Sequence, residues 1–258
     1  YLDMPDDIIQ GEVEESDVQE MATIPDPPRT QTMPEYIDAA LDLLETAERP
    51  LVIVGKGMAY SHAEDEVRAF VERTQIPFLA SPMGKGVMDD NHSLSVGAAR
   101  SHALKEADVI FLMGARLNWI MHYGLPPRFN KDVRIVQLDI SPEAIGNNRP
   151  TEVALVGDGK TIVGQLNSAL EQRQWFFPAG SDWMAAIEEK AAANAAAVQS
   201  MIDDNSAPTN YYRALKDISA WATEDAVIIG EGANTMDIGR TQLPNAAPRL
   251  RLDAGTYG

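Results

Sequence analysis

Short apolar, β-branched runs recur along the middle of this chain, and their spacing limits the possible folds more than any other feature. Candidate strands lie at residues 51–54, 78–80, 108–113, 134–138 and 154–156, with helical segments between several of them. Strands that alternate with helices in this way favour a parallel sheet with helices on both faces. The sequence therefore predicts an α/β fold with a doubly wound, Rossmann-like parallel sheet.

The first run, at residues 51–54, leads directly into the turn GKG at 55–57. Glycine lets a backbone turn sharply and approach a ligand closely, and a helix is expected after the turn, over residues 63–74. A strand, a glycine turn and a helix N-terminus together favour a phosphate-bearing ligand. The dinucleotide fingerprint G-x-G-x-x-G is incomplete here, because its last glycine is replaced by Tyr60. An ordinary connection between a strand and a helix remains the alternative.

Other candidate strands also end in residues suited to a binding crevice. They are followed by the segments 55–57, 81–82, 114–116, 139–141 and 157–159, and four of these five contain glycine or a carboxylate. The carboxyl ends of parallel strands meet at one edge of a sheet, where the ligands of doubly wound folds bind. This coincidence strengthens the prediction of a nucleotide site at that edge.

Three charged residues at this edge have specific candidate roles. Arg116 offers a planar guanidinium suited to a phosphate or to stacking on adenine, and the alternative is a surface arginine. Asp139 is suited to accept hydrogen bonds from both hydroxyls of a ribose, and the alternative is a helix N-cap. Asp158, in a Gly-Asp-Gly turn, is suited to bind an adenine amino group or merely to shape the turn.

Composition divides the chain into four parts. Residues 1–33 are acidic and then proline-rich, which is typical of a linker lying on a surface. The alanine-rich stretch 183–194 predicts a long helix between two α/β units. The expected organisation is a domain end and linker at 1–33, a central nucleotide-binding domain at 34–172, an interdomain helical linker at 173–206 and the beginning of a second α/β domain at 207–258.

The second unit repeats the pattern of strand, turn and helix. A helix is expected at 211–222, a strand at 226–229 and a glycine turn at 230–237. In that turn Asn234 and Thr235 are hydrogen-bond donors suited to a phosphate. A plain connection is again the alternative.

Composition also argues against several classes of function. The formal net charge of −18 argues against a nucleic acid partner, since nothing resembles a basic face. No apolar run reaches the roughly 20 residues that a membrane span requires. The absence of cysteine excludes disulfides and thiolate chemistry and fits a cytoplasmic protein. Both ends of the chain read like interior segments, so we expect a piece of a longer enzyme.

No catalytic constellation is evident in these 258 residues. The histidines His62, His92, His102 and His122 lack the spacing of metal ligands, and we expect them to be structural. Neither a nucleophile elbow nor a cluster of metal-ligating residues is found. Catalytic and metal-binding residues are therefore not expected within this chain.

Six short motifs are weak one by one but specific in combination. They are LVIVGKG at 51–57, GAARS at 97–101, GARLNW at 114–119, LDI at 138–140, GNN at 146–148 and EGANT at 231–235. With them, nearly the whole chain resembles the thiamine-diphosphate-dependent 2-hydroxyacyl-CoA lyases and their close relatives, the oxalyl-CoA decarboxylases. The segment MHYGLPPRF at 121–129 is similar to the lyases rather than to the decarboxylases.

This resemblance implies roles for particular residues. Enzymes of this family have a pyrimidine-binding domain, a nucleotide-fold middle domain and a diphosphate-binding domain, and the chain resembles the end of the first, all of the second and the start of the third. The middle domain of the relatives holds ADP, which implies ADP contacts at Lys56, Arg116, Asp139, Ile140 and Asp158. Contacts to CoA are implied for Ala98, Ala99, Arg100, Ser101 and Asn194. A position near thiamine diphosphate is implied for Tyr211, Asn234, Thr235 and Tyr257.

The implied activity is cleavage of a 2-hydroxyacyl-CoA to formyl-CoA and an aldehyde or ketone, or the reverse condensation, through a thiamine carbanion. The implied cofactors are thiamine diphosphate and Mg²⁺, with their ligands outside this chain, and ADP as a bound nucleotide. A homodimer or homotetramer is expected, in the cytoplasm or, in a eukaryote, the peroxisome. The alternatives are an oxalyl-CoA decarboxylase and a non-catalytic module that binds ADP or CoA. This chain alone is expected to bind ADP, but neither to bind thiamine diphosphate tightly nor to turn over an acyl-CoA.

Overall fold

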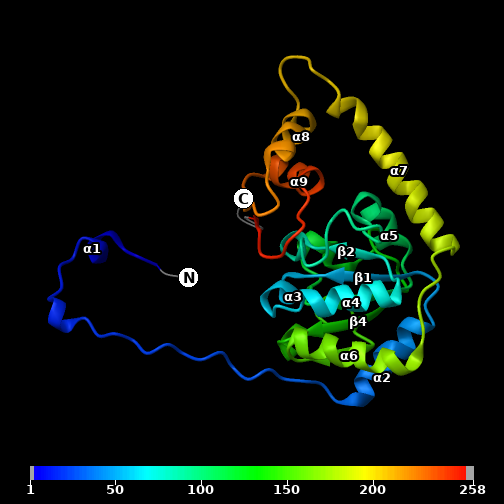
Figure 1. Ribbon diagram of the computed structural model, residues 1–258, viewed down its shortest axis with the longest axis horizontal. Coiled ribbons are helices and arrows are strands. Elements are labelled where there is room, and N and C mark those ends of the chain that lie inside the picture. The colour runs from blue at the N-terminus through cyan, green and yellow to red at the C-terminus, as the bar shows by residue number, and fades with distance from the viewer. Residues whose placement is uncertain (1–2, 254–258) are drawn as a thin grey trace.

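The computed structural model describes residues 3–253, and its largest part is a five-stranded parallel sheet (Figure 1). The strands are β1 (Pro50–Val54), β2 (Phe78–Ala80), β3 (Val109–Met113), β4 (Arg134–Asp139) and β5 (Val153–Val156). Their order is β2-β1-β3-β4-β5. The chain thus winds outward in opposite directions from β1 and β3, and the switch point of the fold lies between these two strands. The expected doubly wound α/β fold is confirmed.

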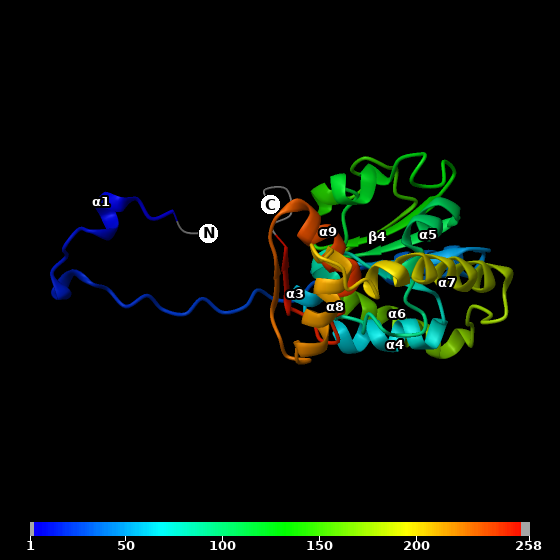
Figure 2. The same ribbon diagram turned by 90° about the horizontal axis from the view of Figure 1, so that it is seen from above.

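Helices cover both faces of the sheet (Figure 2). The middle domain contains α2 (Pro34–Glu45), α3 (Lys56–Tyr60), α4 (Glu64–Thr74), α5 (Arg100–Glu106) and α6 (Gly159–Arg173), with the 3₁₀ turns η2 (Pro82–Gly84), η3 (Gly97–Ala99), η4 (Trp119–Gly124) and η5 (Pro142–Ala144). Helices α2, α4 and α6 pack together on one face, and α5 lies on the other. Phe70 of α4 meets Phe111 of β3 edge to face, with 5.9 Å between the ring centroids, which ties the helix layer to the sheet.

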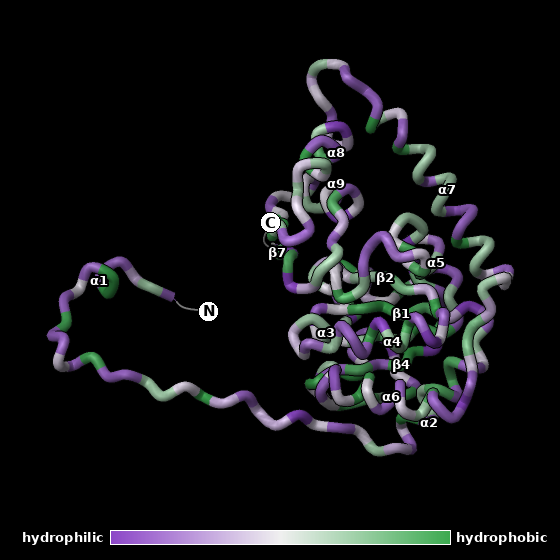
Figure 3. Tube along the Cα trace, viewed as in Figure 1, coloured by the Kyte–Doolittle hydropathy of each residue, from purple (hydrophilic) through white to green (hydrophobic). Residues whose placement is uncertain are grey.

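The central strands are buried on both faces, which explains their nearly continuous apolar sequences. Every residue of β1 and β3 is buried, and in β4 only Arg134 is exposed. Strands β1 and β3 pair from Pro50 opposite Val109 to Val54 opposite Met113. Figure 3 shows these hydrophobic strands between more hydrophilic helices. Because no face of the inner strands meets solvent, their sequences do not alternate between polar and apolar residues.

The turn after β1 differs from the expectation in one respect. The helix expected over 63–74 is present as α4, but the five-residue helix α3 begins at Lys56, inside the turn itself. His62, with a φ of 55°, separates the two helices. The sequence prediction missed α3 because five residues are too few to show a helical apolar pattern.

A long helix, α7 (Asp182–Ile202), leads from the middle domain to a smaller second unit. The indole nitrogen of Trp183 donates a hydrogen bond to the carbonyl oxygen of Pro50 at 3.0 Å and so fixes the start of this helix. The second unit consists of α8 (Tyr211–Trp221), β6 (Ile228–Gly230), α9 (Ala233–Gln242) and β7 (Arg251–Asp253), with β6 and β7 parallel. Strand β6 begins two residues later than the strand expected at 226–229. No helix within residues 3–253 is long and apolar enough to cross a membrane.

Polar contacts join the second unit to the middle domain. Lys85 and Asp90 form an ion pair of 2.7 Å whose side chains are only 12 % and 11 % exposed. The Asp90 carboxylate also accepts a hydrogen bond from the backbone nitrogen of Asn245 at 2.7 Å. Arg249 adds a second link, because it donates to the carboxylate of Glu64 in α4 at 2.8 Å. The two parts of the chain are therefore joined by the Arg249–Glu64 ion pair and by the hydrogen bond between Asn245 and Asp90.

Residues 3–25 extend away from the middle domain (Figures 1 and 2) and are exposed. Within this segment, α1 spans Asp6–Ile9 and η1 spans Glu15–Asp17. The chain docks on the domain just afterwards, where the Thr30 carbonyl accepts a hydrogen bond from the backbone nitrogen of Asp158 at 3.1 Å. The side-chain amide of Gln165 then pairs with the backbone of Thr32 in both directions, at 3.0 and 3.2 Å.

Candidate functional site

A cavity opens at the carboxyl ends of the strands, at the switch point between β1 and β3. Its volume is about 940 Å³, and its walls come from the turns after the strands and from the linker residues Asp26, Pro27 and Arg29. All five residues expected to contact ADP line it, namely Lys56, Arg116, Asp139, Ile140 and Asp158. A cavity of this size is suited to a small molecule such as a nucleotide.

The glycines of the first turn are required by packing between two strand ends. A Cβ atom on Gly55 would overlap the carbonyl oxygen of Gly114, and one on Gly57 would lie 2.8 Å from the Gly114 Cα. The Gly57 nitrogen also donates a hydrogen bond to that carbonyl, at 3.1 Å. These glycines therefore let the turns after β1 and β3 approach each other. Gly57 also lines the cavity, and its predicted approach to a ligand stays a prediction.

Arg116 and Asp139, expected to bind different parts of a ligand, are bonded to each other. The guanidinium donates from Nε to Oδ2 at 2.8 Å and from Nη2 to Oδ1 at 3.0 Å. The Asp139 side chain is 5 % exposed, while that of Arg116 is 57 % exposed. Burial alone would raise the pKa of Asp139, but the hydrogen bonds from Arg116 and from the backbone nitrogen of Ser141 hold that pKa below its usual value. The pair stays ionised, and one edge of the guanidinium is occupied before a ligand arrives.

Asp158 shapes its turn, which is one of the two roles considered for it. Its Oδ1 accepts a hydrogen bond from the backbone nitrogen of Thr161 at 3.0 Å and so caps the N-terminus of α6. Arg29 donates to both carboxylate oxygens, at 2.9 and 3.0 Å. Burial raises the pKa of Asp158, but the bonds from Thr161 and Arg29 bring that pKa below its usual value. Any contact of this carboxylate with a ligand is therefore shared with Arg29.

Lys56 and Ile140 face the cavity with fewer constraints. Among the cations that line it, Lys56 is the one without an ion pair to another residue between 3 and 253, and its side chain is exposed. Its ammonium is thus available to a phosphate. Ile140 is also exposed and supplies apolar surface next to Asp139.

The residues expected to contact CoA lie together at a different place. The side-chain amide of Asn194 on α7 donates to the carbonyl oxygen of Ala98 at 2.7 Å, which brings together two of these residues that are 96 positions apart. Ser101 is exposed, whereas Ala99 is fully buried and offers no side-chain surface. Arg100 begins α5 and is partly buried.

Arg100 lies near other cations that are remote from it in the sequence. Its Nη2 donates to the carbonyl oxygen of Ile120 at 2.9 Å, and it forms no ion pair within residues 3–253. Burial lowers the pKa of Arg100, and the charges of Arg128 and Arg240 lower that pKa further. Burial, with Arg100 and Arg128, also lowers the pKa of His122. No sequence spacing connects these residues, so only the fold shows that Arg100 and Arg128 are neighbouring cations. Arg240 is already paired with Asp237 and Asp253, both at 3.0 Å.

The residues expected near thiamine diphosphate belong to the second unit. Tyr211 is the first residue of α8, and Asn234 and Thr235 lie in the first turn of α9, all three exposed to solvent. Tyr257 lies outside the described residues. Between residues 3 and 253, no three side chains of histidine, aspartate or glutamate are grouped so as to hold a metal ion.

The histidines occupy different surroundings. His92 accepts a hydrogen bond from the backbone nitrogen of Leu94 at 3.1 Å, and the ring of His102 lies 5.9 Å from that of Trp183. His62, by contrast, lines the nucleotide-sized cavity.

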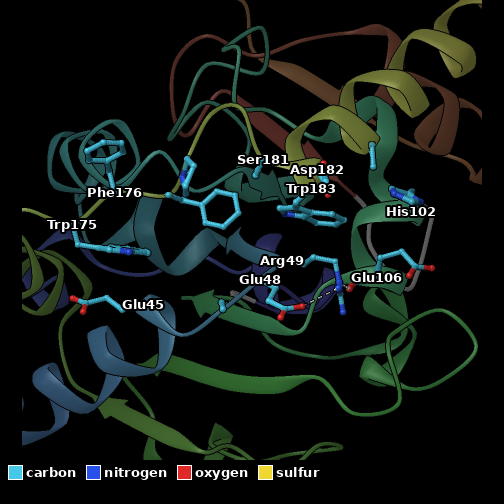
Figure 4. A pocket seen from close by; sticks show the side chains of 14 residues that line it. Glu45, Glu48, Arg49, His102, Glu106, Trp175, Phe176, Ser181, Asp182 and Trp183 are labelled. Atoms are coloured by element: carbon cyan, nitrogen blue, oxygen red, sulfur yellow. Dashed lines mark hydrogen bonds and ion pairs between the residues drawn. The ribbon is translucent and has the colours of Figure 1, made fainter.

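A second pocket, of about 730 Å³, lies at the opposite, amino-terminal edge of the sheet (Figure 4). The aromatic rings of Trp175 and Trp183 form part of its wall, and Arg49 lies near Trp183 and Glu106. Arg49 donates to the carbonyl oxygen of Glu106 at 2.6 Å and lies 3.6 Å from the carboxylate of Glu48. None of the residues expected to bind a ligand lines this pocket.

The open parallel sheet, with a nucleotide-sized cavity at its switch point, defines a nucleotide-fold domain. Residues 37–166 match the model of a more specific family, the central domain of thiamine pyrophosphate enzymes. The chain therefore belongs to the thiamine pyrophosphate enzymes, and the resemblance seen in its motifs is confirmed.

Known proteins are similar to this chain along its whole length. It is 44 % identical to 2-hydroxyacyl-CoA lyase 1 of Homo sapiens over 258 residues, which cover 100 % of this chain and 45 % of that protein. It is 37 % identical to the oxalyl-CoA decarboxylase of Escherichia coli K12 over 262 residues, which cover 100 % of this chain and 46 % of that protein. The chain thus spans about half the length of the curated relatives it matches. A solved structure from Mycobacterium smegmatis, assigned as a thiamin diphosphate-dependent enzyme, shares the fold with a TM-score of 0.66 at 17 % identity, over 92 % of this chain and 44 % of that one.

Proposed function

We propose that this chain is the nucleotide-binding middle part of a 2-hydroxyacyl-CoA lyase. The whole enzyme would cleave a 2-hydroxyacyl-CoA to formyl-CoA and an aldehyde or ketone, and the reverse condensation would use the same groups. The observation that carries the nucleotide part is the cavity at the switch point, in which all five residues implied by the family resemblance meet. Assembly as a homodimer or homotetramer, in the cytoplasm or peroxisome, belongs to the same proposal.

The chemistry of the cavity fits ADP. The free ammonium of Lys56 is suited to a phosphate, and the exposed face of the Arg116 guanidinium is suited to stacking on adenine. Asp139 accepts two hydrogen bonds from Arg116 and one from the backbone nitrogen of Ser141, so a ribose hydroxyl would share the carboxylate with these donors. Ile140 adds apolar contact beside it.

The acyl-CoA substrate would bind at the surface around Arg100. Arg100 and Arg128 support this placement, because guanidinium groups bind phosphates well and CoA carries several. Ala98 and Asn194, joined by a hydrogen bond, would supply the adjoining polar turn. This part of the chain therefore contributes binding of the substrate rather than a chemical step.

Thiamine diphosphate supplies the electron sink for carbon–carbon cleavage when it is bound. Residues 3–253 do not fit the metal that accompanies its diphosphate, since Mg²⁺ needs several oxygen ligands and no three histidine, aspartate or glutamate side chains in this range are grouped to hold a metal ion. Asn234 and Thr235 are exposed neutral donors. We therefore assign no reaction step to the side chains of this segment.

An oxalyl-CoA decarboxylase is the second candidate, with the same cofactor and a different substrate. The higher identity to the human lyase, 44 % against 37 % for the bacterial decarboxylase, favours the lyase. Product analysis of the full-length protein separates the two, because the lyase releases an aldehyde or ketone with formyl-CoA and the decarboxylase releases CO₂. A non-catalytic module that binds ADP or CoA, the third candidate, would release neither.

Calorimetric titration of this chain with ADP tests the nucleotide site. We expect one ADP per chain, and we expect Lys56→Ala to weaken it about 10-fold or more, since a bond to a charged group is lost. A parallel titration with thiamine diphosphate and Mg²⁺ should show no tight binding. Lack of ADP binding, or micromolar binding of thiamine diphosphate, would show that the site is misplaced.

A further inference from the structure

The linker forms one wall of the nucleotide cavity, although it is remote in sequence from the turns that form the rest. Asp26, Pro27 and Arg29 line the cavity together with those turns. Residues 3–28 are otherwise exposed, and the bonds of Thr30 and Thr32 to the middle domain follow immediately. The segment 26–32 is thus docked at the mouth of the cavity.

A single nitrogen of Arg29 makes the polar contacts of this side chain. Its Nη1 donates to both oxygens of Asp158, at 2.9 and 3.0 Å, and to the carbonyl oxygen of Ser61, at 2.9 Å. Its Nε and Nη2 have no acceptor within residues 3–253, and the side chain remains 47 % exposed. Arg29 therefore keeps N–H groups for a further anion beside the cavity.

The charges of the cavity explain why a nucleotide would need this arginine. The cavity is lined by the carboxylates of Asp26, Asp139, Asp158 and Asp253 and by the cations Arg29, Lys56 and Arg116. Arg116 is already bonded to Asp139. If Arg29 were absent, Asp158 would face the phosphates of a nucleotide without a counter-charge, and Lys56 alone would attract them.

We propose that Arg29 is a ligand-binding residue of this cavity, which contacts the phosphates of a nucleoside diphosphate while it neutralises Asp158. Nucleotide binding and docking of residues 26–32 then stabilise each other, because both use one guanidinium. The inference rests on the proposed nucleotide site and adds to it a wall from the linker.

The test compares ADP with adenosine, which lacks phosphates, by calorimetry on the whole chain. In Arg29→Gln, the affinity for ADP should fall about 10-fold or more, the effect of a lost charged hydrogen bond, while that for adenosine changes less than about twofold. Arg29→Lys, which keeps the charge, should recover part of the loss. The control is Lys160→Gln, since Lys160 lies two residues after Asp158 but pairs with Glu66 at 3.5 Å and does not line the cavity; it should leave ADP binding unchanged.

Hydrogen exchange of the unaltered protein provides a measurement that needs no variant. Saturating ADP should slow exchange of the backbone amides at residues 29–33, and adenosine should slow it less. If Arg29→Gln weakens ADP and adenosine equally, or if ADP leaves the linker exchange unchanged, Arg29 is structural and the inference is wrong. If Lys56→Ala weakens ADP binding while Arg29→Gln does not, the inference about Arg29 fails and the proposed nucleotide site stands. If the unaltered chain binds no ADP, both fail.

Discussion

The Arg116 guanidinium and the Asp139 carboxylate bond to each other across the ends of β3 and β4, through hydrogen bonds of 2.8 and 3.0 Å. The exposed arginine is thereby held by the buried carboxylate. Two groups that the sequence suggests as separate ligand contacts thus act as one unit. A nucleotide in the proposed site would meet an arginine whose position is already fixed, which would reduce the entropy lost on binding.

This pairing predicts that variants of the two residues have non-additive effects on ADP binding. Arg116→Ala and Asp139→Asn should each weaken ADP binding. The double variant should lose less binding free energy than the sum of the two single losses, with a coupling energy of about 0.5–3 kcal/mol. Calorimetric titration of the four proteins measures the coupling. Lys56→Ala combined with Asp139→Asn should be additive, because Lys56 bonds to neither partner. Additive effects of Arg116→Ala and Asp139→Asn would show that the pair is not a functional unit.

The contact between the turns after β1 and β3 predicts opposite effects for two glycine substitutions. Gly55→Ala should destabilise the protein by about 1–3 kcal/mol or more, because the added methyl group would meet the backbone of Gly114 and the adjoining residue, which cannot move aside as a side chain can. Gly164→Ala is the control, since this glycine lies inside α6 with no atom within 4 Å of the added Cβ. It should stabilise the protein by about 0.5–1 kcal/mol through helix propensity. Urea denaturation measures both changes, and equal effects of the two substitutions would contradict the packing role of Gly55.

The sheet was predictable from the sequence because burial on both faces leaves a simple pattern. Strands such as β1 and β3 must be apolar at every position, and such runs are visible without knowledge of their neighbours. Short or partly exposed elements leave no such pattern. The five-residue helix α3 has no recognisable sequence pattern, and the start of β6, whose residues are only partly buried or exposed, was predicted two residues too early.

The set of residues in the cavity was predictable, but their partners were not. The ends of parallel strands share one edge of a sheet, so Lys56, Arg116, Asp139 and Asp158 had to lie near one another. Which of them bond to each other depends on the reach of the side chains. The partner of Asp158 is Arg29, which is 129 positions away in a segment that resembles a surface linker. Neither periodicity nor motif spacing contains that information.

The buried ion pair of Lys85 and Asp90 predicts a large effect of its disruption on stability. Asp90→Ala should lower the free energy of unfolding by about 3–5 kcal/mol at pH 7, because Lys85 loses its counter-charge and Asn245 loses a hydrogen-bond acceptor. Lys131→Ala is the control, because it breaks an ion pair with Asp132 in which both side chains are largely exposed. It should change the free energy of unfolding by less than about 1 kcal/mol.

The loss of unfolding free energy caused by Asp90→Ala should also depend on pH. Burial lowers the pKa of Lys85, and Asp90 partly opposes this, so removal of Asp90 should lower that pKa further. A lysine whose pKa is lower in the folded than in the unfolded state favours folding as pH rises toward its ordinary pKa of about 10.4. Urea denaturation at pH 7 and pH 9.5 should therefore show a smaller difference from the wild type at the higher pH. A constant difference would contradict the role of Lys85.

The Arg249–Glu64 pair, which links the second unit to α4, should weaken in acid. The hydrogen bond from Arg249 is the main cause of the lowered pKa of Glu64. Such a carboxylate stabilises the folded contact above its ordinary pKa, about 4.3, and this stabilisation disappears as pH falls through the lower folded value. Arg249→Gln should therefore lower the free energy of local opening of residues 243–253 by about 1 kcal/mol at pH 7, with little difference from the wild type at pH 3. Hydrogen exchange of the amides at residues 243–253, which include β7, read separately from those of β1 and β3, measures this local opening. If the effect of Arg249→Gln is as large at pH 3 as at pH 7, the contact does not depend on ionised Glu64, and the Arg249 bond to the Ala59 carbonyl must hold the two parts together instead.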